Sequence, residues 1–325
     1  MGVRMRVAVV IPCFRAGERV LKVIERVGRD VEWIFLVDDA CPEKTGELVV
    51  ARCTDPRVRV IFHAENQGVG GAMVTGYAAA LETDADIVVK IDADGQMAPE
   101  LIPALCRPIV KGISDYSKGN RFHMSGSVDS MPALRLFGNV VLSFMTKLSS
   151  GYWQLFDPTN GFTAIHARVL GELNLSKLSK RYFFESDMLF RLNGLRAVVT
   201  EMPMKAVYDD EPSSLRPLQV VWPFMKGNLR NFLKRIVRRY FIADFSMASI
   251  ELVLSIPLLL FGMIYGGYHW IENHGSAHAA SAGVVMTAAL PIILGMQLLL
   301  SWLNYDVTGQ PVHALHLQLG ELEES

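Results

Sequence analysis

Residues 87–96 read IVVKIDADGQ, an apolar run that ends in two aspartates spaced two residues apart. The run is short, rich in β-branched residues and followed by polar residues, which predicts a buried β-strand. Asp92 and Asp94 come directly after it, so a tight turn can bring both carboxylates toward one point. Carboxylate and phosphate oxygens are the ligands that Mg²⁺ and Mn²⁺ prefer. The stretch therefore predicts a site for a divalent cation and a diphosphate at the carboxyl end of a strand.

Strand and helix signals alternate on both sides of this stretch. Three more apolar, β-branched runs occur at 7–11, 33–37 and 58–62. Helix-length segments follow the four strands in turn, at 17–27, 45–51, 69–81 and 99–110. Strands buried on both faces with helices between them predict an α/β fold with a doubly wound, mostly parallel sheet. Ligands of such sheets bind beyond the carboxyl ends of the strands, where this chain places polar and charged residues after every run.

The segment Asn66–Gly71 reads NQGVGG and precedes a predicted helix, so its backbone N–H groups could face a phosphate. It does not fit the dinucleotide-binding fingerprint, because Met73 stands where that pattern needs a third glycine. The chain also has no Walker lysine motif. These departures argue against a nicotinamide-dependent dehydrogenase and favour another nucleotide-diphosphate ligand.

Composition divides the 325-residue chain into three zones. The totals are 32 basic and 33 acidic residues with 50% hydrophobic residues, which excludes a disordered chain and argues against a general nucleic-acid binder. Residues 1–218 hold 26 basic and 26 acidic groups, residues 219–239 hold six basic and no acidic groups, and residues 240–325 hold seven acidic groups without Lys or Arg. The four cysteines are irregularly spaced, which is typical of reduced thiols.

The last zone contains two long uncharged runs, at 252–268 and 279–305. Each approaches the ~20 residues that a helix needs to cross ~30 Å of hydrocarbon, and only a short polar segment separates them. We therefore expect a two-helix transmembrane hairpin over residues 246–305, followed by a short cytoplasmic tail at 306–325. A buried hairpin of a soluble protein is the alternative. Gly262 and Gly266 form a small-xxx-small pair, which favours a homo-oligomer.

The middle zone, residues 219–245, predicts a basic amphipathic helix. Its cations recur about every four residues with apolar residues between them, as in helices that lie at a membrane surface. A solvated charged helix is the alternative. Basic residues before a span favour the cytoplasmic side, so we expect an integral membrane protein whose catalytic domain, residues 1–218, faces the cytoplasm, most simply at a bacterial inner membrane.

Seven motifs carry a family resemblance. They are, in chain order, VVIPCFRAGERV, FLVDDACPEKT, ENQGVGGAMVTGY, VVKIDADGQMAPE, GNR, DPTNGFTAI and FFESDMLFRL. Together they resemble the inverting GT-A glycosyltransferases of family 2, and most closely the polyprenyl-phosphate hexosyltransferases that are similar to dolichol-phosphate mannose synthase. The resemblance covers about residues 5–205, and a C-terminal membrane hairpin is similar to that of bacterial members.

The resemblance implies roles for individual residues. A first group would bind the donor: Pro12, Phe14, Asp38 and Asp39 on the nucleotide, with Asn66 and Gly70 nearby, Asp92 and Asp94 on the metal and diphosphate, and Gln96 near the sugar. Arg121 and Arg135 would contact phosphates. Relatives carry IP-x-Y-N-E after the first strand, whereas this chain has Phe14-Arg15-Ala16-Gly17-Glu18, so Glu18 is the substitute acidic contact. Lys205 would serve the lipid phosphate.

The FFESD motif leaves two interpretations open. Glu185 and Asp187 match the region where relatives with hydroxyl acceptors keep a catalytic base, so Asp187 is a candidate catalytic residue. Alternatively, the pair only complements the dipole at a helix N-terminus. The expected function is transfer of a hexose, with Mg²⁺ or Mn²⁺, from a nucleotide-diphosphate sugar to a polyprenyl phosphate such as undecaprenyl or dolichyl phosphate. The rivals are a family 2 enzyme that uses a hydroxyl of a lipid-linked glycan or glycolipid, and a non-catalytic membrane-anchored nucleotide-sugar binding protein.

Overall fold

The computed structural model describes residues 5–122, 133–204, 217–274 and 280–323. The chain forms two compact units. The first comprises residues 1–232 and 311–325, and the second comprises residues 233–310. The C-terminal residues thus belong to the first unit, although the sequence led us to expect a separate short tail. Arg135 has a described backbone but its side chain lies outside the described residues, as does the whole of Lys205.

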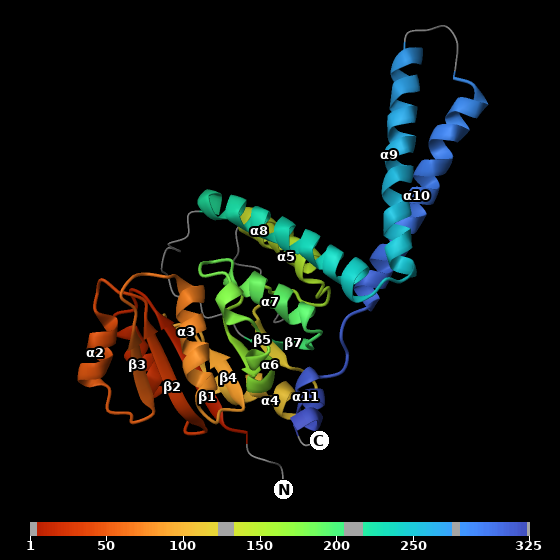
Figure 1. Ribbon diagram of the computed structural model, residues 1–325. Coiled ribbons are helices and arrows are strands. Elements are labelled where there is room, and N and C mark those ends of the chain that lie inside the picture. The colour runs from red at the N-terminus through yellow and green to blue at the C-terminus, as the bar shows by residue number, and fades with distance from the viewer. Residues whose placement is uncertain (1–4, 123–132, 205–216, 275–279, 324–325) are drawn as a thin grey trace. The chain divides into compact units, whose positions relative to one another are not determined.

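A seven-stranded sheet forms the centre of the first unit, in the order β3-β2-β1-β4-β6-β5-β7 (Figure 1). The strands are β1 (Val7–Cys13), β2 (Val31–Asp38), β3 (Val58–Phe62), β4 (Ile87–Lys90), β5 (Tyr116–Asn120), β6 (Thr163–His166) and β7 (Val199–Pro203). Only β6 runs antiparallel to its neighbours, β4 and β5, and the other pairs are parallel. The predicted doubly wound, mostly parallel sheet is confirmed.

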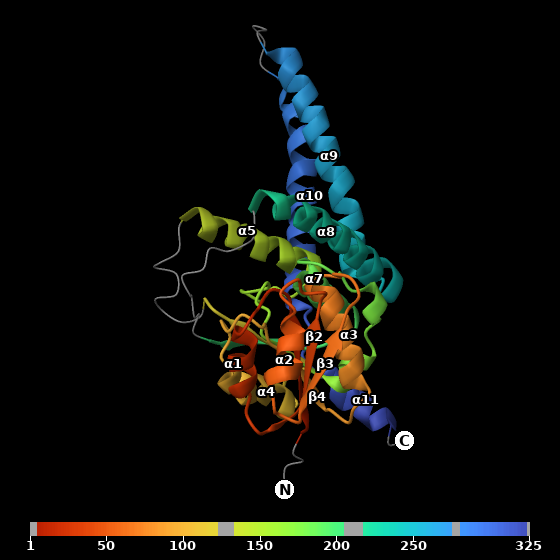
Figure 2. The ribbon, with the colours of Figure 1, turned by 90° about the vertical axis from the view of Figure 1, so that its left-hand side faces the viewer.

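Helices cover both faces of this sheet, as Figure 2 shows. The helices of the first unit are α1 (Arg19–Glu25), α2 (Thr45–Arg52), α3 (Val69–Leu81), η1 (Pro99–Leu101), α4 (Ile102–Val110), α5 (Ala133–Ser150), α6 (Ala167–Gly171), η2 (Leu175–Lys177), α7 (Phe184–Gly194) and α11 (Leu315–Glu323). Alternate residues of β1 point to opposite faces, so Val9 packs with α1 and α4 while Val10 packs with α3 and α7. The four predicted helices are all present.

Strands β5, β6 and β7 were not predicted from the sequence. Strand β5 reads YSKGN and contains a lysine, yet every one of its residues is buried. Strands of four or five residues with such mixed polarity give no periodic signal, and they become strands here because neighbours satisfy their backbone groups. Their position matters for function, because β5 and β6 extend the sheet next to β4, and Asp92 and Asp94 lie in the loop that follows β4.

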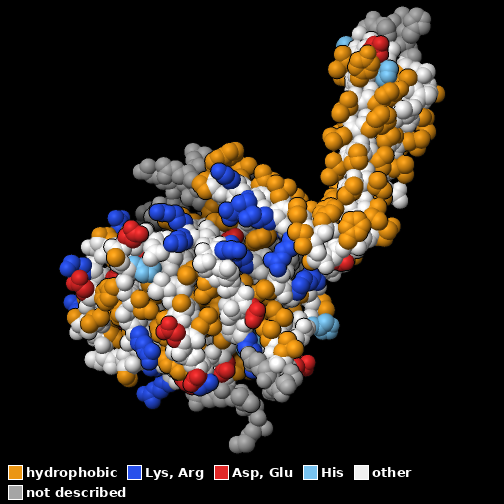
Figure 3. Space-filling view, viewed as in Figure 1, with side chains coloured by type: hydrophobic (Ala, Val, Ile, Leu, Met, Phe, Trp, Pro, Cys, Tyr) orange, Lys and Arg blue, Asp and Glu red, His pale blue; other side chains and the backbone are white. Residues whose placement is uncertain are grey.

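Helix α8 (Pro217–Val237) begins in the first unit and ends in the second. It buries Asn228 and Asn231, which are 2% and 1% exposed, while Trp222, Met225 and Leu229 are 70%, 41% and 59% exposed. Asn231 donates to Asp187 and Asn228 contacts Ser149, so polar bonds hold the buried face. The outward face of α8 therefore combines apolar side chains with the exposed Lys226, Arg230 and Lys234, whereas Arg235 is buried. Figure 3 shows hydrophobic and basic side chains along this helix.

The second unit contains a π-helical turn, η3 (Arg238–Ala243), and two long apolar helices, α9 (Met247–Asn273) and α10 (Ala282–Thr308). Both helices are long and apolar enough to cross a membrane, and only 22% and 6% of their most apolar windows are buried. The core hairpin of a soluble protein would be mostly buried. The exposure of α9 and α10 therefore argues against a buried hairpin and favours a transmembrane one. Figure 3 shows orange side chains over the length of this hairpin.

Small residues of α9 and α10 face each other within one chain. A Cβ atom added at Gly262 would lie 2.7 Å from the Ala288 carbonyl oxygen, and one added at Gly266 would lie 3.1 Å from Ala288 Cβ. The two glycines thus allow close packing inside the hairpin. Their spacing therefore has an explanation within one chain, and it no longer favours a homo-oligomer.

Helix α11 joins the first unit through a buried polar cluster. Asp115 accepts hydrogen bonds from the backbone N–H groups of Leu315 (2.9 Å) and His316 (2.8 Å), and its Oδ1 lies 2.7 Å from His316 Nδ1. The ring of His316 stacks on His166 with centroids 4.3 Å apart. Because Asp115 and both histidines are buried, this contact returns the end of the chain to the first unit after the hairpin.

We expect acidification to destabilise this cluster. Burial, and then the neighbouring His316, lower the pKa of His166 to about 4, so the folded chain keeps this ring neutral where an unfolded chain protonates it. Burial alone would raise the pKa of Asp115, but its hydrogen bonds, that from His316 foremost, hold it below the ordinary range, so the carboxylate remains charged. Unfolding then takes up a proton between pH 6.5 and 4, and stability falls by about 2 kcal/mol from pH 7 to pH 5.

The measurement is thermal unfolding of the wild type and of His166→Phe, which keeps a ring for the stack, across this pH range. The variant should lose less stability on acidification than the wild type. Parallel curves for the two proteins would contradict the assignment.

Candidate active site

The carboxyl ends of neighbouring parallel strands bring the predicted residues to one edge of the sheet. Cys13, at the end of β1, pairs with Asp38 at the end of β2, and Val10 of β1 pairs with Lys90 at the end of β4. Pro12 lies within β1, and Phe14 follows it with 45% of its surface exposed. The segments that carry Asp38, Asp39, Asp92 and Asp94 therefore lie at the same edge of the sheet, on either side of the end of β1.

A tight turn shapes the loop after β4. The backbone N–H of Gln96 donates to Asp94 Oδ1 at 2.9 Å, and Gly95 has φ +82°, a conformation that favours glycine. Burial, with a smaller contribution from Asp92, raises the pKa of Asp94. The contribution of Asp92 is a repulsion between two negative charges, and a cation placed between the carboxylates of Asp92 and Asp94 would offset it.

The side chains available as metal ligands at this edge suit a cation that is bound partly by the protein and partly by a substrate. Among the described residues, no cluster of three or more His, Cys, Asp or Glu side chains could hold a metal ion. Asp92 and Asp94 supply two carboxylates, each with one oxygen that accepts a bond from the protein. Mg²⁺ is typically bound by one or two carboxylates plus substrate phosphates, with water in the other positions. The residues therefore fit a metal–diphosphate site, and they do not fit a cage made by protein alone.

Asp38 and Asp39 organise the loops of this edge. Asp38 accepts from the backbone N–H groups of Cys41 (2.7 Å) and Gly46 (2.6 Å). Asp39 accepts from the N–H groups of Gln67 (2.8 Å) and Gly68 (2.7 Å), and its Oδ1 lies 2.7 Å from His63 Nδ1. The two side chains are only 3% and 2% exposed, so their carboxylate oxygens serve the fold. Their role in nucleotide binding stays a prediction.

The expectation that the Asn66–Gly71 backbone cradles a phosphate needs correction for part of this segment. The N–H groups of Gln67 and Gly68 are directed to Asp39, and that of Gly71 donates to the Lys180 carbonyl oxygen at 3.1 Å. A Cβ at Gly70 would collide with the backbone at Ser179. The glycines therefore permit close contact between two protein segments. Asn66 donates to the Asp39 carbonyl oxygen at 3.1 Å, which holds the same loop.

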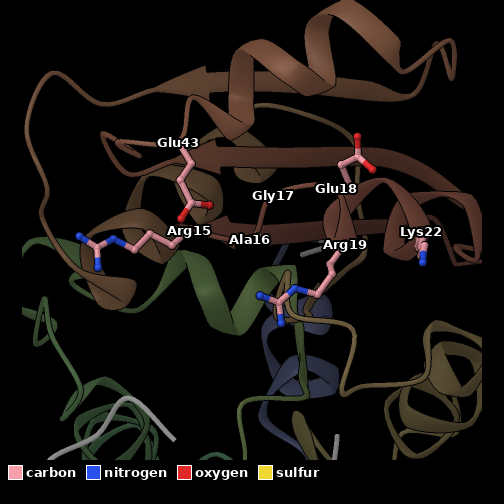
Figure 4. A pocket seen from close by; sticks show the side chains of 7 residues that line it. All are labelled: Arg15, Ala16, Gly17, Glu18, Arg19, Lys22 and Glu43. Carbon is pink, nitrogen blue, oxygen red and sulfur yellow. The ribbon is translucent and has the colours of Figure 1, made fainter. Parts of the chain in front are cut away.

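A pocket opens beside the loop after β1 (Figure 4). Its lining combines three cations with two acids and consists of Arg15, Ala16, Gly17, Glu18, Arg19, Lys22 and Glu43. Arg19 contributes to the electrostatic environment of Asp94, which places the pocket near the predicted cation site. Glu18 pairs with Arg52 at 2.6 Å and is 70% exposed in its side chain. A nucleotide contact by Glu18 stays a prediction.

Arg121 is held by an acid that the sequence analysis had not singled out. Asp157, in the DPTNGF motif, accepts from Arg121 Nε at 2.8 Å and from its terminal nitrogen at 3.0 Å. Burial opposes the charge of Asp157, but the Arg121 guanidinium outweighs it and holds the pKa of the carboxyl below its usual range. Asp157 is 1% exposed and Arg121 is 34% exposed, so the pair presents the guanidinium toward the accessible side. The acid at the start of a family motif was the signal that could have identified it.

The two acids of α7 have different surroundings. Asp187 is fully buried and accepts from Ser179 N (3.0 Å), Arg191 Nε (2.9 Å) and Asn231 Nδ2 (2.9 Å). Glu185 is 15% exposed and lies 3.3 Å from Lys90 Nζ, the same ammonium that contacts Asp92. Glu185 therefore lies beside the predicted cation site, whereas Asp187 joins α7 to the preceding loop and to α8.

Lys90 is a second residue that the sequence analysis had not selected. It is 1% exposed, and its Nζ lies 2.8 Å from Asp92 Oδ1 and 3.2 Å from the Gly161 carbonyl oxygen. Burial would lower the pKa of Lys90, but Asp92 and Glu185 outweigh that effect and raise it. A lone charge in an apolar four-residue strand was the signal that could have identified it.

A sheet of this order, with paired aspartates at its carboxyl edge, defines a GT-A-like transferase fold. Glucosyl-3-phosphoglycerate synthase from Mycobacterium tuberculosis, in its complex with Mn²⁺ and UDP-glucose, has this fold with a TM-score of 0.53 at 19% identity, over 71% of this chain and 79% of that one. Residues 8–173 match the family model described as Glycosyl transferase family 2. The chain therefore belongs to glycosyltransferase family 2.

Two relatives with similar sequences act on polyprenyl phosphates. A UDP-N-acetylglucosamine–dolichyl-phosphate N-acetylglucosaminyltransferase from Methanococcus voltae is 29% identical over 62% of this chain and 85% of its own length. An undecaprenyl-phosphate mannosyltransferase from Micrococcus luteus is 31% identical over 62% of this chain and 84% of its own length. The predicted resemblance to polyprenyl-phosphate glycosyltransferases is confirmed.

Proposed function

We propose that this glycosyltransferase moves a hexose from a nucleotide-diphosphate sugar to a polyprenyl phosphate, with inversion at C1. The observation that carries the proposal is the pair Asp92 and Asp94 at the carboxyl edge of the sheet, next to a pocket with three cations. A divalent cation held there would stabilise the negative charge of the departing diphosphate. The names of the relatives support a lipid phosphate as the acceptor.

Acceptor chemistry agrees with the residues around the site. A phosphate monoester already carries negative charge near pH 7, since its second pKa is about 6. Its oxygen needs positioning and cations more than it needs a base. Arg121, which Asp157 holds in place, and Arg135 and Lys205 are our candidates for its phosphate contacts.

Features of α8 and of the hairpin support a membrane location with the catalytic unit on the cytoplasmic side. Helix α8 exposes Trp222, Met225 and Leu229 beside basic residues, as a helix at a lipid surface does. Residues on both sides of the hairpin belong to the first unit, so the chain returns to the side from which it entered. The basic residues before α9 favour the cytoplasmic side for that unit.

The test is to incubate membranes that contain the protein with a panel of labelled nucleotide sugars and polyprenyl phosphate. We expect one donor to yield a labelled lipid that carries a single phosphate. The double variant Asp92→Asn/Asp94→Asn provides the matched negative control. Label that enters a glycan or glycolipid, with no dependence on added polyprenyl phosphate, would replace our proposal with the hydroxyl-acceptor function.

The hairpin should matter for long lipids and much less for catalysis itself. We expect replacement of residues 246–310 by a flexible Gly/Ser linker to leave a folded catalytic unit that keeps α11, because that unit has its own core. Transfer to long-chain polyprenyl phosphate in vesicles should fall sharply, whereas transfer to a short water-soluble analogue should change by less than about threefold, a loss of under 1 kcal/mol.

A truncation of residues 246–325 is the comparison for the linker variant. It also removes α11, and with it three contacts to Asp115, so it should be less stable than the linker variant. Equal losses with both acceptors in the linker variant would show that the hairpin is required for catalysis itself.

A further inference from the structure

Lys90 provides a buried positive charge beside Asp92, one of the two predicted ligands of the cation. It is the last residue of β4, and a buried ammonium is costly unless acceptors surround it. Its three acceptors come from separate parts of the chain: Asp92 Oδ1 at 2.8 Å, the Gly161 carbonyl oxygen at 3.2 Å and Glu185 Oε1 at 3.3 Å. Lys90 therefore joins the loop after β4, the loop before β6 and the start of α7.

Gly161 makes this arrangement possible. A Cβ atom at this position would collide with Lys90 Nζ and would lie 2.8 Å from Asp92 Oδ2. Only a residue without a side chain lets the loop before β6 lie against both groups. The glycine of the DPTNGF motif thus has a physical explanation in the contact between Lys90 and Asp92.

The same ammonium connects the predicted donor site to α8. Glu185 lies in the first turn of α7, and two residues later Asp187 accepts a hydrogen bond from Asn231 of α8 at 2.9 Å. Phe183, just before α7, packs edge-on against Phe224 of α8 with ring centroids 5.5 Å apart. A chain of contacts therefore runs from Asp92 through Lys90 and Glu185 to the helix that we expect at the lipid surface.

We propose that Lys90 is a positioning residue that fixes Asp92 for the metal–diphosphate group and ties it, through Glu185, to α7 and α8. The charges support this role, because three carboxylates, Asp92, Asp94 and Glu185, with one ammonium leave a net charge of −2 that matches a divalent cation. Without Lys90 the carboxylates of Asp92 and Glu185 would repel each other across the space it fills. The proposal rests on the proposed function, since it assigns Asp92 to the donor.

The test uses the full-length protein and four variants: Lys90→Met, Glu185→Gln, the double variant, and Lys111→Met as a control at an exposed lysine. Thermal unfolding is measured in EDTA and in Mn²⁺, each with UDP present to supply the diphosphate, which requires no acceptor and no turnover. Lys90→Met should unfold at a lower temperature in EDTA, and Mn²⁺ should recover more of its stability than it adds to the wild type, because the added cation offsets the carboxylate repulsion. The double variant should be more stable in EDTA than Lys90→Met, because it removes one of the repelling charges.

Kinetics separate positioning from a merely structural role. Displacement of a reacting group by about 1 Å can cost about 10²-fold in rate, so kcat of folded Lys90→Met should fall by about that factor, with a smaller change in the KM of the donor. Lys111→Met should behave as the wild type. A kcat of Lys90→Met within about twofold of the wild type would overturn the proposal. So would a loss of stability in Lys90→Met that is the same in EDTA and in Mn²⁺, together with a double variant whose loss is the sum of the two single losses. If no donor and polyprenyl phosphate react with the wild type, the proposed function fails, while the unfolding measurements still decide whether Lys90 serves the cation site.

Discussion

Replacement of Asp92 or Asp94 by asparagine is expected to lower kcat by roughly 10²–10³, the usual cost of one preorganised electrostatic contact to a developing charge. Each variant removes one negative charge from a site where two carboxylates meet the predicted cation. Excess EDTA should abolish turnover of the wild type, and Mg²⁺ or Mn²⁺ should restore it. The measurement is initial rate against metal concentration with the donor identified by the panel assay.

The control for this prediction is Asp84→Asn. Asp84 is also a charged aspartate, but its side chain is 79% exposed and pairs with Arg6 at the surface, so the change should leave the rate unaltered. Undiminished activity in excess EDTA would refute the metal assignment. Loss of activity in the control variant would instead indicate a general effect on folding.

Asp187→Asn is expected to lower stability by about 3 kcal/mol, because the carboxylate is buried and accepts from a guanidinium, an amide and a backbone N–H. For a unit of this size the melting temperature should fall by on the order of 10 °C. The kcat of the protein that remains folded should change only modestly. Thermal unfolding and single-turnover rates on the same preparation provide the measurement.

Glu47→Gln is the matched control for Asp187→Asn. Glu47 is also an acid in the first turn of a helix, but it is 61% exposed and pairs with Lys44 on the surface. Such pairs contribute about 0–1 kcal/mol, so this variant should unfold near the wild-type temperature. An inactive Asp187→Asn enzyme with normal stability would show that Asp187 acts in catalysis.

The two acids of α7 also distinguish the two acceptor classes. A sugar hydroxyl needs a general base within hydrogen-bond reach, a contribution of typically ~10²–10⁴ in rate. Of the pair, Glu185 lies beside Asp92 and is partly accessible, so the requirement for a base should appear in Glu185→Gln. With the phosphate acceptor that we propose, Glu185→Gln should cost less than that range. A loss of two orders of magnitude, with metal-dependent stability unchanged, would favour the hydroxyl acceptor.

Local patterns determined much of this protein. Strands β1, β2 and β4 were predictable because burial on both faces selects continuous β-branched runs, and this signal lies within five to eight residues. The edge strand β3 has a run of the same kind, although its residues are only partly buried or exposed. The two long apolar helices were equally clear, because about 20 uncharged residues are rare except where the surroundings are apolar. The Asp92–Asp94 pair could be placed at the carboxyl edge of the sheet because it follows one of these strands directly.

Contacts between distant segments decided the rest. Strands β5 to β7 are short and partly polar, so only their neighbours in the sheet make them strands. Asp187 resembled a catalytic acid by its motif, yet Ser179, Arg191 and Asn231 surround it. The glycine-rich segment resembled a phosphate cradle. However, the backbone N–H groups of Gln67 and Gly68 donate to Asp39, and that of Gly71 donates to the Lys180 carbonyl oxygen.

The site itself illustrates the physical reason for this division. The sequence by itself determined that two carboxylates follow a buried strand, because that information is carried by ten consecutive residues. Only the tertiary structure decided that Lys90 lies between Asp92 and Glu185 and that Gly161 leaves room for it, since these residues are separated by 71 and 95 positions along the chain. Hydropathy and periodicity depend on neighbours in sequence, whereas the pairing of buried charges depends on neighbours in space.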